Sequence, residues 1–239
     1  MPRFFIDYIP QQTAEITGGD ARHIALSLRM KIGEELTLTH GGTDYFCNIE
    51  SINPESVVLA VKSSAPCAAE PSVELTLFQA VPKLDKLETI VQKAVELGAC
   101  RIVPVLTRRC ISRPKEHEFE KKRARLSKIA LEAAKQSGRG IVPEIAPLTS
   151  FKKAVAEMKK SDVALMCYEN GGKHFSEIEL CKSGSVSLLI GSEGGFDFEE
   201  ADFAVESGVV PIWLGSRILR CETAPIAAIS VIMHMTGNF

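Results

Sequence analysis

The sequence predicts an α/β protein in which a small β-barrel precedes a larger domain built on a parallel sheet. Over the first 70 residues, short apolar runs are separated by turn residues, which is typical of a small barrel. After residue 70, buried strand-like runs alternate with helical periodicity, which indicates a parallel sheet with helices on both faces. With 45% hydrophobic and 24% charged residues over 239 positions, the composition is that of a globular protein.

The barrel-like part contains a few short strands and one short helix. The strands are expected at 4–6, 35–40, 45–49 and 57–61, and the helix within 20–30. Gly41-Gly42 follows an alternating run and predicts a two-residue hairpin. The Ser- and Pro-containing stretch 63–71 predicts a linker. We therefore expect two domains, over 1–70 and 71–239.

The larger part alternates strands with helices. Strands are expected at 73–80, 101–106, 163–167, 186–190 and 210–214, and helices near 84–98, 117–137, 149–160, 174–181 and 197–207. In the helix over 117–137 one face is apolar, with Leu126, Ile129, Ala130 and Ala133, and the other carries Lys121, Arg125, Lys128 and Lys135. Residues 101–139 hold 12 Lys and Arg against 4 Asp and Glu. This excess favours a nucleic-acid contact or an ordinary solvated face.

Two glycine-bearing loops follow the last two expected strands. The first is Gly191-Ser192-Glu193-Gly194-Gly195, and the second begins at Gly215 and leads into an apolar C-terminal helix. Loops at the carboxyl ends of parallel strands form the binding crevice, so both predict one pocket. The first loop is neither a Walker A nor a GxGxxG motif, and Glu193 would repel a pyrophosphate. Glu193 either binds a ligand with hydrogen-bond donors or positive charge, such as a sulfonium, or only caps the next helix.

The second loop adds two permanent cations. Arg217 and Arg220 stand beside Gly215, where they either receive a polyanionic substrate or pair with Glu222 or Asp202. The helix that follows is apolar almost all round after Pro225, which is typical of a buried helix or an oligomer interface.

The seven cysteines are scattered, without a CxxC pair or a zinc-ligand spacing. We expect reduced thiols and no metal, with Cys221 in a packing role. No apolar run is long enough to span a membrane and no signal peptide is evident. The sequence therefore predicts a cytoplasmic protein.

Four separated motifs resemble the RsmE family, the 16S ribosomal RNA (uridine-N3) methyltransferases of the SPOUT superfamily. They are 23–33 (HIALSLRMKIG), 83–98 (with KLDK and QKAVELG), 132–139 (EAAKQSGR), and the two glycine loops, IGSEGGF at 190–196 and LGSRILRCETA at 214–224. The resemblance covers nearly the whole chain. Two positions depart from the family pattern: Ser192 stands where Pro is usual, and Cys221 where Thr is usual.

The resemblance implies a PUA-like β-barrel followed by a SPOUT α/β domain whose C-terminus forms a trefoil knot, an exception to unthreaded topologies. It also implies a homodimer that binds S-adenosyl-L-methionine in a bent form. Carried onto this chain, the cofactor-binding residues are Tyr168, Ile190, Gly191, Glu193, Gly194, Leu214, Gly215, Ile218, Leu219, Thr223 and Ala224.

The implied reaction is methylation of N3 of a uridine in 16S ribosomal RNA of the 30S subunit. We expect Arg220, helped by Arg217, to stabilise the uridine anion or an adjacent phosphate, and Glu222 to orient an arginine or act as base. Candidate RNA contacts are Arg29, Lys83, Lys86, Lys93, Lys121, Arg125, Lys128, Gln136 and Arg139. The alternatives are a ribosomal RNA-binding or assembly factor with a degenerate cofactor pocket, and a small-molecule enzyme with a nucleotide cofactor.

Overall fold

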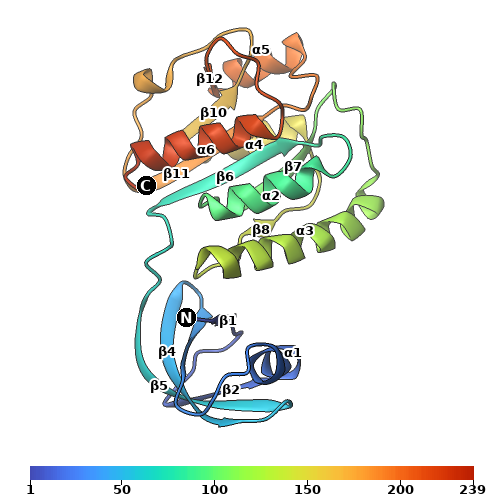
Figure 1. Cartoon of the computed structure of the whole chain (residues 1–239). Helices are drawn as coiled ribbons and strands as arrows, with labels where there is room; N and C mark the ends of the chain where they lie inside the picture. The colour runs from blue at the N-terminus through green and yellow to red at the C-terminus, as the bar shows by residue number, and fades with distance from the viewer. The chain divides into compact units, whose positions relative to one another are not determined.

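The computed structural model describes all residues, 1–239, and divides them into two compact units (Figure 1). The first unit comprises 1–70 together with 134–141, and the second comprises 71–133 and 142–239. The segment 134–141 groups with the first unit, although the sequence places it within the expected second domain, 71–239.

The first unit is built on a five-stranded sheet with the order β1-β3-β4-β5-β2. Its elements are β1 (Arg3–Phe5), β2 (Thr13–Thr17), α1 (Gly18–Arg22), a π-helical turn η1 (His23–Ser27), β3 (Glu35–His40), β4 (Thr43–Ile52) and β5 (Ser56–Pro66). β1 is parallel to β3 and the other pairs are antiparallel. The apolar side chains Phe4, Ile24, Leu36, Leu38 and Leu59 belong to one buried core.

The predicted hairpin is confirmed, because Gly41 and Gly42 join β3 to β4 with φ values of 54° and 80°. The predicted linker is wrong over 63–66, which continues β5 and pairs with 43–46 of β4. Two register shifts in the β4–β5 pair bend these long strands. The sequence does not identify this part of the strand, because its Ser and Ala residues lack the alternation of apolar and polar side chains that is typical of strands.

The second unit contains the predicted parallel sheet, with the order β12-β10-β11-β6-β7-β8 and β9 paired to β7. The strands are β6 (Val73–Ala80), β7 (Arg101–Leu106), β8 (Glu144–Ile145), β9 (Thr149–Ser150), β10 (Val163–Cys167), β11 (Gly184–Ile190) and β12 (Val210–Ile212). The helices are α2 (Lys86–Glu96), α3 (Glu116–Ser137), α4 (Phe151–Met158), α5 (Phe198–Glu206) and α6 (Thr223–Met235).

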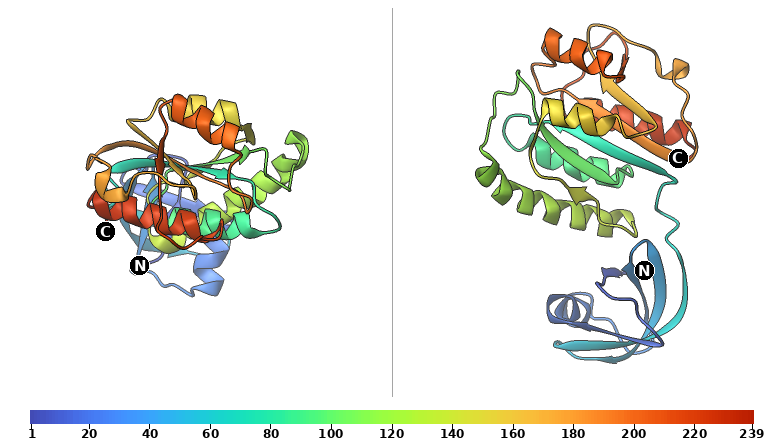
Figure 2. Two further views of the ribbon diagram at one scale, coloured as in Figure 1. Left: turned by 90° about the horizontal axis from the view of Figure 1, so that it is seen from above. Right: turned by 180° about the vertical axis from the view of Figure 1, so that it is seen from behind.

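Helices cover both faces of this sheet. α2 and α6 contact each other on one face, and the view from behind shows α4 and α5 on the other (Figures 1 and 2). Strand alternation directs Phe78 of β6 to the second face, where it shares a core with Phe151 of α4 and Ala204 of α5. Both faces are therefore apolar, as a parallel sheet requires.

The helix predicted over 174–181 is wrong, since only a 3₁₀ turn, η2 (Phe175–Glu177), forms there. Glu177 and His174 cap this turn reciprocally, and Ile178 is already extended. Ile178 is also the only buried residue of this stretch, so a longer helix would have no apolar face to pack against the sheet.

The order of the last strands brings distant segments together. β12 lies outside β10, and the segment after β10 runs beside it: the Tyr168 N–H donates to Ile212 O at 3.0 Å, and the Lys173 N–H to Pro211 O at 2.9 Å. From β12 the chain returns over 213–222 to α6. The trefoil knot at this place stays a prediction. Because every strand is parallel, the loops that follow β6, β10, β11 and β12 lie at one edge of the sheet.

Candidate cofactor and substrate site

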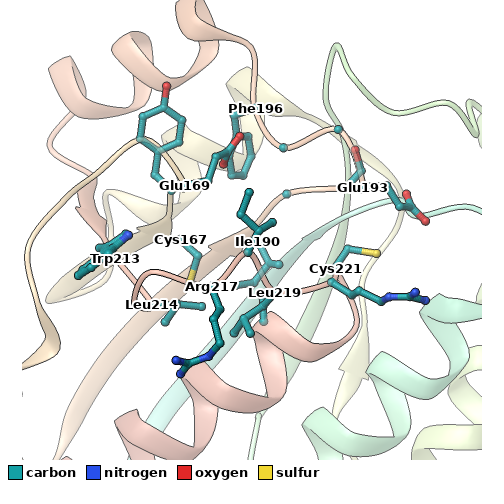
Figure 3. A pocket seen from close by; sticks show the side chains of 18 of the residues that line it. Cys167, Glu169, Ile190, Glu193, Phe196, Trp213, Leu214, Arg217, Leu219 and Cys221 are labelled. Carbon is teal, nitrogen blue, oxygen red and sulfur yellow. The ribbon is translucent and has the colours of Figure 1, made fainter.

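A pocket of about 570 Å³ lies at this edge of the parallel sheet. Its walls come from the segments that follow β10, β11 and β12, and from the first turn of α2. Ile190, Leu214 and Leu219 lie together in the middle of it, and Glu193 lies beside Cys221 (Figure 3). The pocket therefore combines an apolar centre with charged groups at its border.

The loop 191–195 depends on its glycines. The Gly195 N–H donates to Ser192 O at 3.0 Å, and Gly195 has a φ of 65°. A Cβ on Gly195 would collide with the Glu169 carboxylate. Glycine at this position therefore allows the tight turn and the close approach of Glu169 to the loop.

Ser192 and Gly194 of this loop pack against Arg109. The Ser192 side chain is buried, and its hydroxyl lies 3.4 Å from Arg109 O. Arg109 Nη1 donates to Gly194 O at 3.0 Å. These contacts hold the loop at the position where the family usually has Pro.

Lys86 connects the two loops. Its Nζ lies 3.1 Å from Glu193 Oε1 and 3.2 Å from Glu222 Oε2. The backbone N–H of Lys83 also donates to Glu193 Oε1 at 3.2 Å. One ammonium thus joins a carboxylate of the first glycine loop to a carboxylate at the start of α6.

These contacts shift the pKa values of all three groups. Hydrogen bonds to Glu193 and Glu222 raise the pKa of Lys86. Partial burial alone would raise the pKa of Glu193, but its own backbone N–H, Lys86 and Lys83 lower it below its usual value. Glu222 behaves similarly: burial opposes ionisation, and the Cys221 thiol, its own N–H and Lys86 outweigh it. All three groups are charged at neutral pH.

Cys221 is a hydrogen-bond donor in this cluster. Its Sγ lies 3.2 Å from Glu222 Oε2, and burial, followed by the bond to Glu222, raises the pKa of the thiol to about 12. Burial also raises the pKa of Cys167 on the opposite wall. Neither thiol is a nucleophile at neutral pH, because the thiolate is the reactive form.

The structure brings the sequence-predicted cofactor residues together, with one exception. Tyr168, Ile190, Gly191, Glu193, Gly194, Leu214, Gly215, Ile218, Leu219 and Ala224 line the pocket, whereas Thr223 does not. Glu193 does not cap the next helix, since Asp197 is the N-cap of α5. The carboxylate of Glu193 instead contacts Lys86 and the Lys83 N–H while lining the pocket.

Arg217 and Arg220 line the pocket from its exposed side. The structure contains no ion pair between either guanidinium and Glu222 or Asp202, so the alternative of surface pairing is wrong. Glu222 is not part of the pocket wall and acts on it through Lys86. Both arginines are therefore available to a ligand at the pocket mouth.

Several pocket residues were missed from the sequence: Cys167, Glu169, Phe196, Trp213 and the side chain of Lys86. Trp213 directly follows β12, and Glu169 is the second residue after β10. Their position after a buried strand is a signal that could have found them. Phe196 packs into the core below the first loop.

Two of the predicted RNA contacts need correction. Lys86 is a pocket residue paired with two carboxylates. Arg139 is only 2% exposed and its Nη2 lies 2.7 Å from Glu70 Oε2, so its guanidinium is used within the first unit. Two others have surface partners, Lys93 with Glu96 and Arg125 with Glu88. Arg29, Lys83, Lys121, Lys128 and Gln136 are exposed.

The chain contains no group of three or more His, Cys, Asp or Glu side chains that could hold a metal ion. None of its helices combines the length and the apolar character that crossing a membrane requires.

Comparison with known proteins gives a consistent result over the whole chain. Residues 69–233 match the family model of an RNA methyltransferase domain, and residues 16–62 match that of an RNA methyltransferase PUA domain. Ribosomal RNA small subunit methyltransferase E of Bacillus subtilis is 34% identical over 99% of this chain and 97% of its own length.

Solved structures agree. The ribosomal RNA small subunit methyltransferase E of Neisseria gonorrhoeae, bound to S-adenosyl methionine, superimposes with a TM-score of 0.87 at 30% identity, covering 98% of each chain. A methyltransferase from Legionella pneumophila in complex with the same cofactor superimposes with a TM-score of 0.84 at 31% identity, covering 97% of this chain and 96% of its own. The expected PUA-like unit and α/β unit are thereby confirmed.

Proposed function

Because the chain belongs to the RNA methyltransferase family that includes the ribosomal RNA small subunit methyltransferase E proteins, we propose that it methylates N3 of a uridine in 16S ribosomal RNA. The methyl donor is S-adenosyl-L-methionine. The observation that carries this proposal is the pocket itself, in which glycine loops and two carboxylates surround an apolar centre at the carboxyl ends of parallel strands.

The residues of the pocket fit this cofactor. A volume of about 570 Å³ is adequate for a ligand of its size. Ile190, Leu214 and Leu219 would provide apolar contacts, and Glu169 and Glu193 could accept hydrogen bonds from hydroxyl or ammonium groups of the cofactor. When bound, S-adenosyl-L-methionine supplies an electrophilic methyl group on a sulfonium.

The residues of the chain prepare uridine N3 for methylation. Loss of the N3 proton leaves negative charge on O2 and O4, and the exposed guanidinium groups of Arg220 and Arg217 at the pocket mouth stabilise that charge or an adjacent phosphate. Lowering of its pKa makes Glu222 a weak base. Its bonds to Lys86 and Cys221 favour the positioning role over the role of general base.

The protein acts as a homodimer on the 30S subunit in the cytoplasm. α6 carries a row of apolar side chains that the chain covers only in part: Ile226, Ala227, Val231 and Met235. These half-buried apolar side chains support a subunit interface on α6. Sedimentation of the purified protein tests this, with a dimer expected and a monomer overturning it.

The test of the function is transfer of labelled methyl from S-adenosyl-L-methionine to 16S RNA, offered as naked RNA and as assembled 30S particles, followed by identification of the modified base. We expect N3-methyluridine. Methylation of another atom would contradict the proposed substrate. Binding of RNA without any binding of the cofactor by calorimetry would favour the assembly-factor alternative.

Arg220 provides the first mutational prediction. Arg220→Ala should lower turnover about 100-fold, as removal of one oxyanion-stabilising donor does, and change the Kd for S-adenosyl-L-methionine less than threefold. Arg220→Lys, which retains a charge without the planar fork, should recover part of the turnover. Unchanged turnover of Arg220→Ala would remove Arg220 from the mechanism.

A further inference from the structure

Leu84 combines two features that are unfavourable in the protein by itself. Its side chain is 82% exposed, and its φ is 57°, in the left-handed region that residues other than glycine avoid. Arg29 is the only other residue besides glycine with a positive φ. A strained conformation that also exposes a large apolar side chain indicates a functional position.

Hydrogen bonds to two distant segments and one local bond hold the turn that contains Leu84. The Lys83 N–H donates to Glu193 Oε1 at 3.2 Å, and Lys122 Nζ donates to Leu84 O at 3.2 Å. The Glu88 N–H donates to Asp85 O at 2.9 Å as α2 begins. Leu84 therefore projects from a turn that is attached to the cofactor loop on one side and to α3 on the other.

Two amines lie beside Leu84, next to the pocket. Lys83 is exposed, and Lys122 contacts the Leu84 carbonyl. Lys86, two residues further, is already paired with Glu193 and Glu222. Amines that contact phosphates, combined with an apolar side chain that packs against a base, are the means by which proteins hold a nucleic acid strand open. The amines of Lys83 and Lys122 fit an RNA backbone better than an apolar protein partner.

We propose that Leu84 is a substrate contact that packs against the unpaired base next to the target nucleotide. This inference rests on the proposed function, in which the target base must leave its stack to reach the pocket. Leu84 fills the space that the target base vacates and prevents it from stacking again. The bond from the Lys83 N–H fixes its position relative to the Glu193 loop, and the bond from Lys122 fixes it relative to α3.

The test uses Leu84→Gly, Leu84→Ala and Leu84→Met in the full-length enzyme with two RNA substrates. Both RNAs contain the target uridine, one in a folded hairpin and the other in an unstructured strand. Glycine tolerates the φ of 57°, so Leu84→Gly should be at least as stable as the parent in thermal unfolding. Its Kd for S-adenosyl-L-methionine, measured by calorimetry, should not change.

The expected result is a rise in KM of roughly tenfold for the folded RNA with Leu84→Gly and Leu84→Ala, as loss of one base contact predicts, and a smaller rise for the unstructured RNA. Leu84→Met should restore the parent values. The matched control is Val205→Ala, which shortens another exposed aliphatic side chain of the second unit, outside the pocket.

Three outcomes would overturn the inference. They are parent KM values for both RNAs with Leu84→Gly, an equal rise for both RNAs, and a weakened affinity for the cofactor. Failure of the parent enzyme to methylate these RNAs, naked 16S RNA and 30S particles would instead contradict the proposed function, so the two failures are distinguishable.

Discussion

Lys86 occupies the first position of α2, where the helix dipole opposes a positive charge. The carboxylates of Glu193 and Glu222 outweigh that cost, because each lies within 3.2 Å of the ammonium. Together the three groups carry one net negative charge beside the pocket, which complements a sulfonium. We infer that Lys86 sets the positions of both loops.

The dependence of thermal stability on pH at acidic values provides a prediction for Glu193. Its pKa is lowered in the folded protein, so the stability that its ionised form contributes is complete above the ordinary value of 4.5 and is lost as the pH falls through the lowered value. The pKa of Lys86 is raised, so its contribution is complete below 10.5 and is lost only at higher pH. The contribution of the Lys86–Glu193 pair to thermal stability should therefore stay constant between pH 4.5 and pH 10.5.

Glu193→Gln should remove part of this acid dependence. It should also weaken binding of S-adenosyl-L-methionine about tenfold at pH 7.5, since a neutral amide is a poorer partner for cations and donors. Calorimetry across a pH series measures both effects. Glu199→Gln is the control, because Glu199 is a surface carboxylate paired with Arg108 outside the pocket. An identical pH profile in parent and Glu193→Gln would contradict the role of this carboxylate.

Residues of the site were predictable where the signal is local. Gly191, Glu193, Arg217 and Arg220 lie in two short loops whose composition indicates a pocket. Lys86 was assigned to RNA because its partners, Glu193 and Glu222, are more than 100 positions away in the chain. Only the folded sheet brings them together.

At the scale of elements, the segment 168–173 runs against 211–213. The Trp213 N–H donates to Lys173 O at 3.0 Å, and a Cβ on Gly172 would come within 2.6 Å of Pro211 O. Gly171 has open space at the same position. This contact joins the walls of the pocket that follow β10 and β12.

Gly172→Ala should separate the two segments. Gly171 and Gly172 both have a positive φ, 121° and 149°. The control variant Gly171→Ala therefore has the same kind of backbone strain as Gly172→Ala. The steric clash is specific to Gly172 and should cost about 1–3 kcal/mol more in urea unfolding, with weaker cofactor binding. Equal stability of the two variants would contradict the close packing.

Periodicity predicted most elements because their apolar faces are continuous. β6, β7 and β10 occupy the predicted ranges, since strands buried on both faces read as uninterrupted apolar runs. The errors at 63–66 and 174–181 concern exposed stretches, where hydrogen bonding to a neighbour rather than burial decides the structure. The trefoil knot was expected from the family resemblance alone, because periodicity carries no signal for threading.

At the scale of the whole molecule, Glu70 holds the segment 139–141 in the first unit. Its Oε1 accepts from the Gly140 N–H at 2.7 Å and the Ile141 N–H at 2.9 Å, and its Oε2 from Arg139 Nη2 at 2.7 Å. The sequence could not reveal this pair, since a buried arginine in a basic segment looks like its solvated neighbours.

Glu70→Ala should therefore destabilise the first unit. Removal of one partner leaves the buried Arg139 without this carboxylate, which typically costs about 3–5 kcal/mol. Glu70→Gln should cost less, because its amide oxygen still accepts hydrogen bonds. Urea unfolding followed by circular dichroism measures the loss. Glu55→Ala, at an exposed turn of the same unit, should have little effect, and a Glu70→Ala protein as stable as this control would contradict the assignment.

The Glu70 contacts also determine where the chain can be divided into domains for chimaeras and truncations. Since the first unit needs 134–141 as well as 1–70, a single junction after residue 70 does not separate a transplantable module. A chimaera that borrows this unit for another enzyme must carry both segments, and a truncated 71–239 fragment would leave Arg139 without its carboxylate. Recombination during evolution meets the same restriction, so the two units are expected to be inherited together.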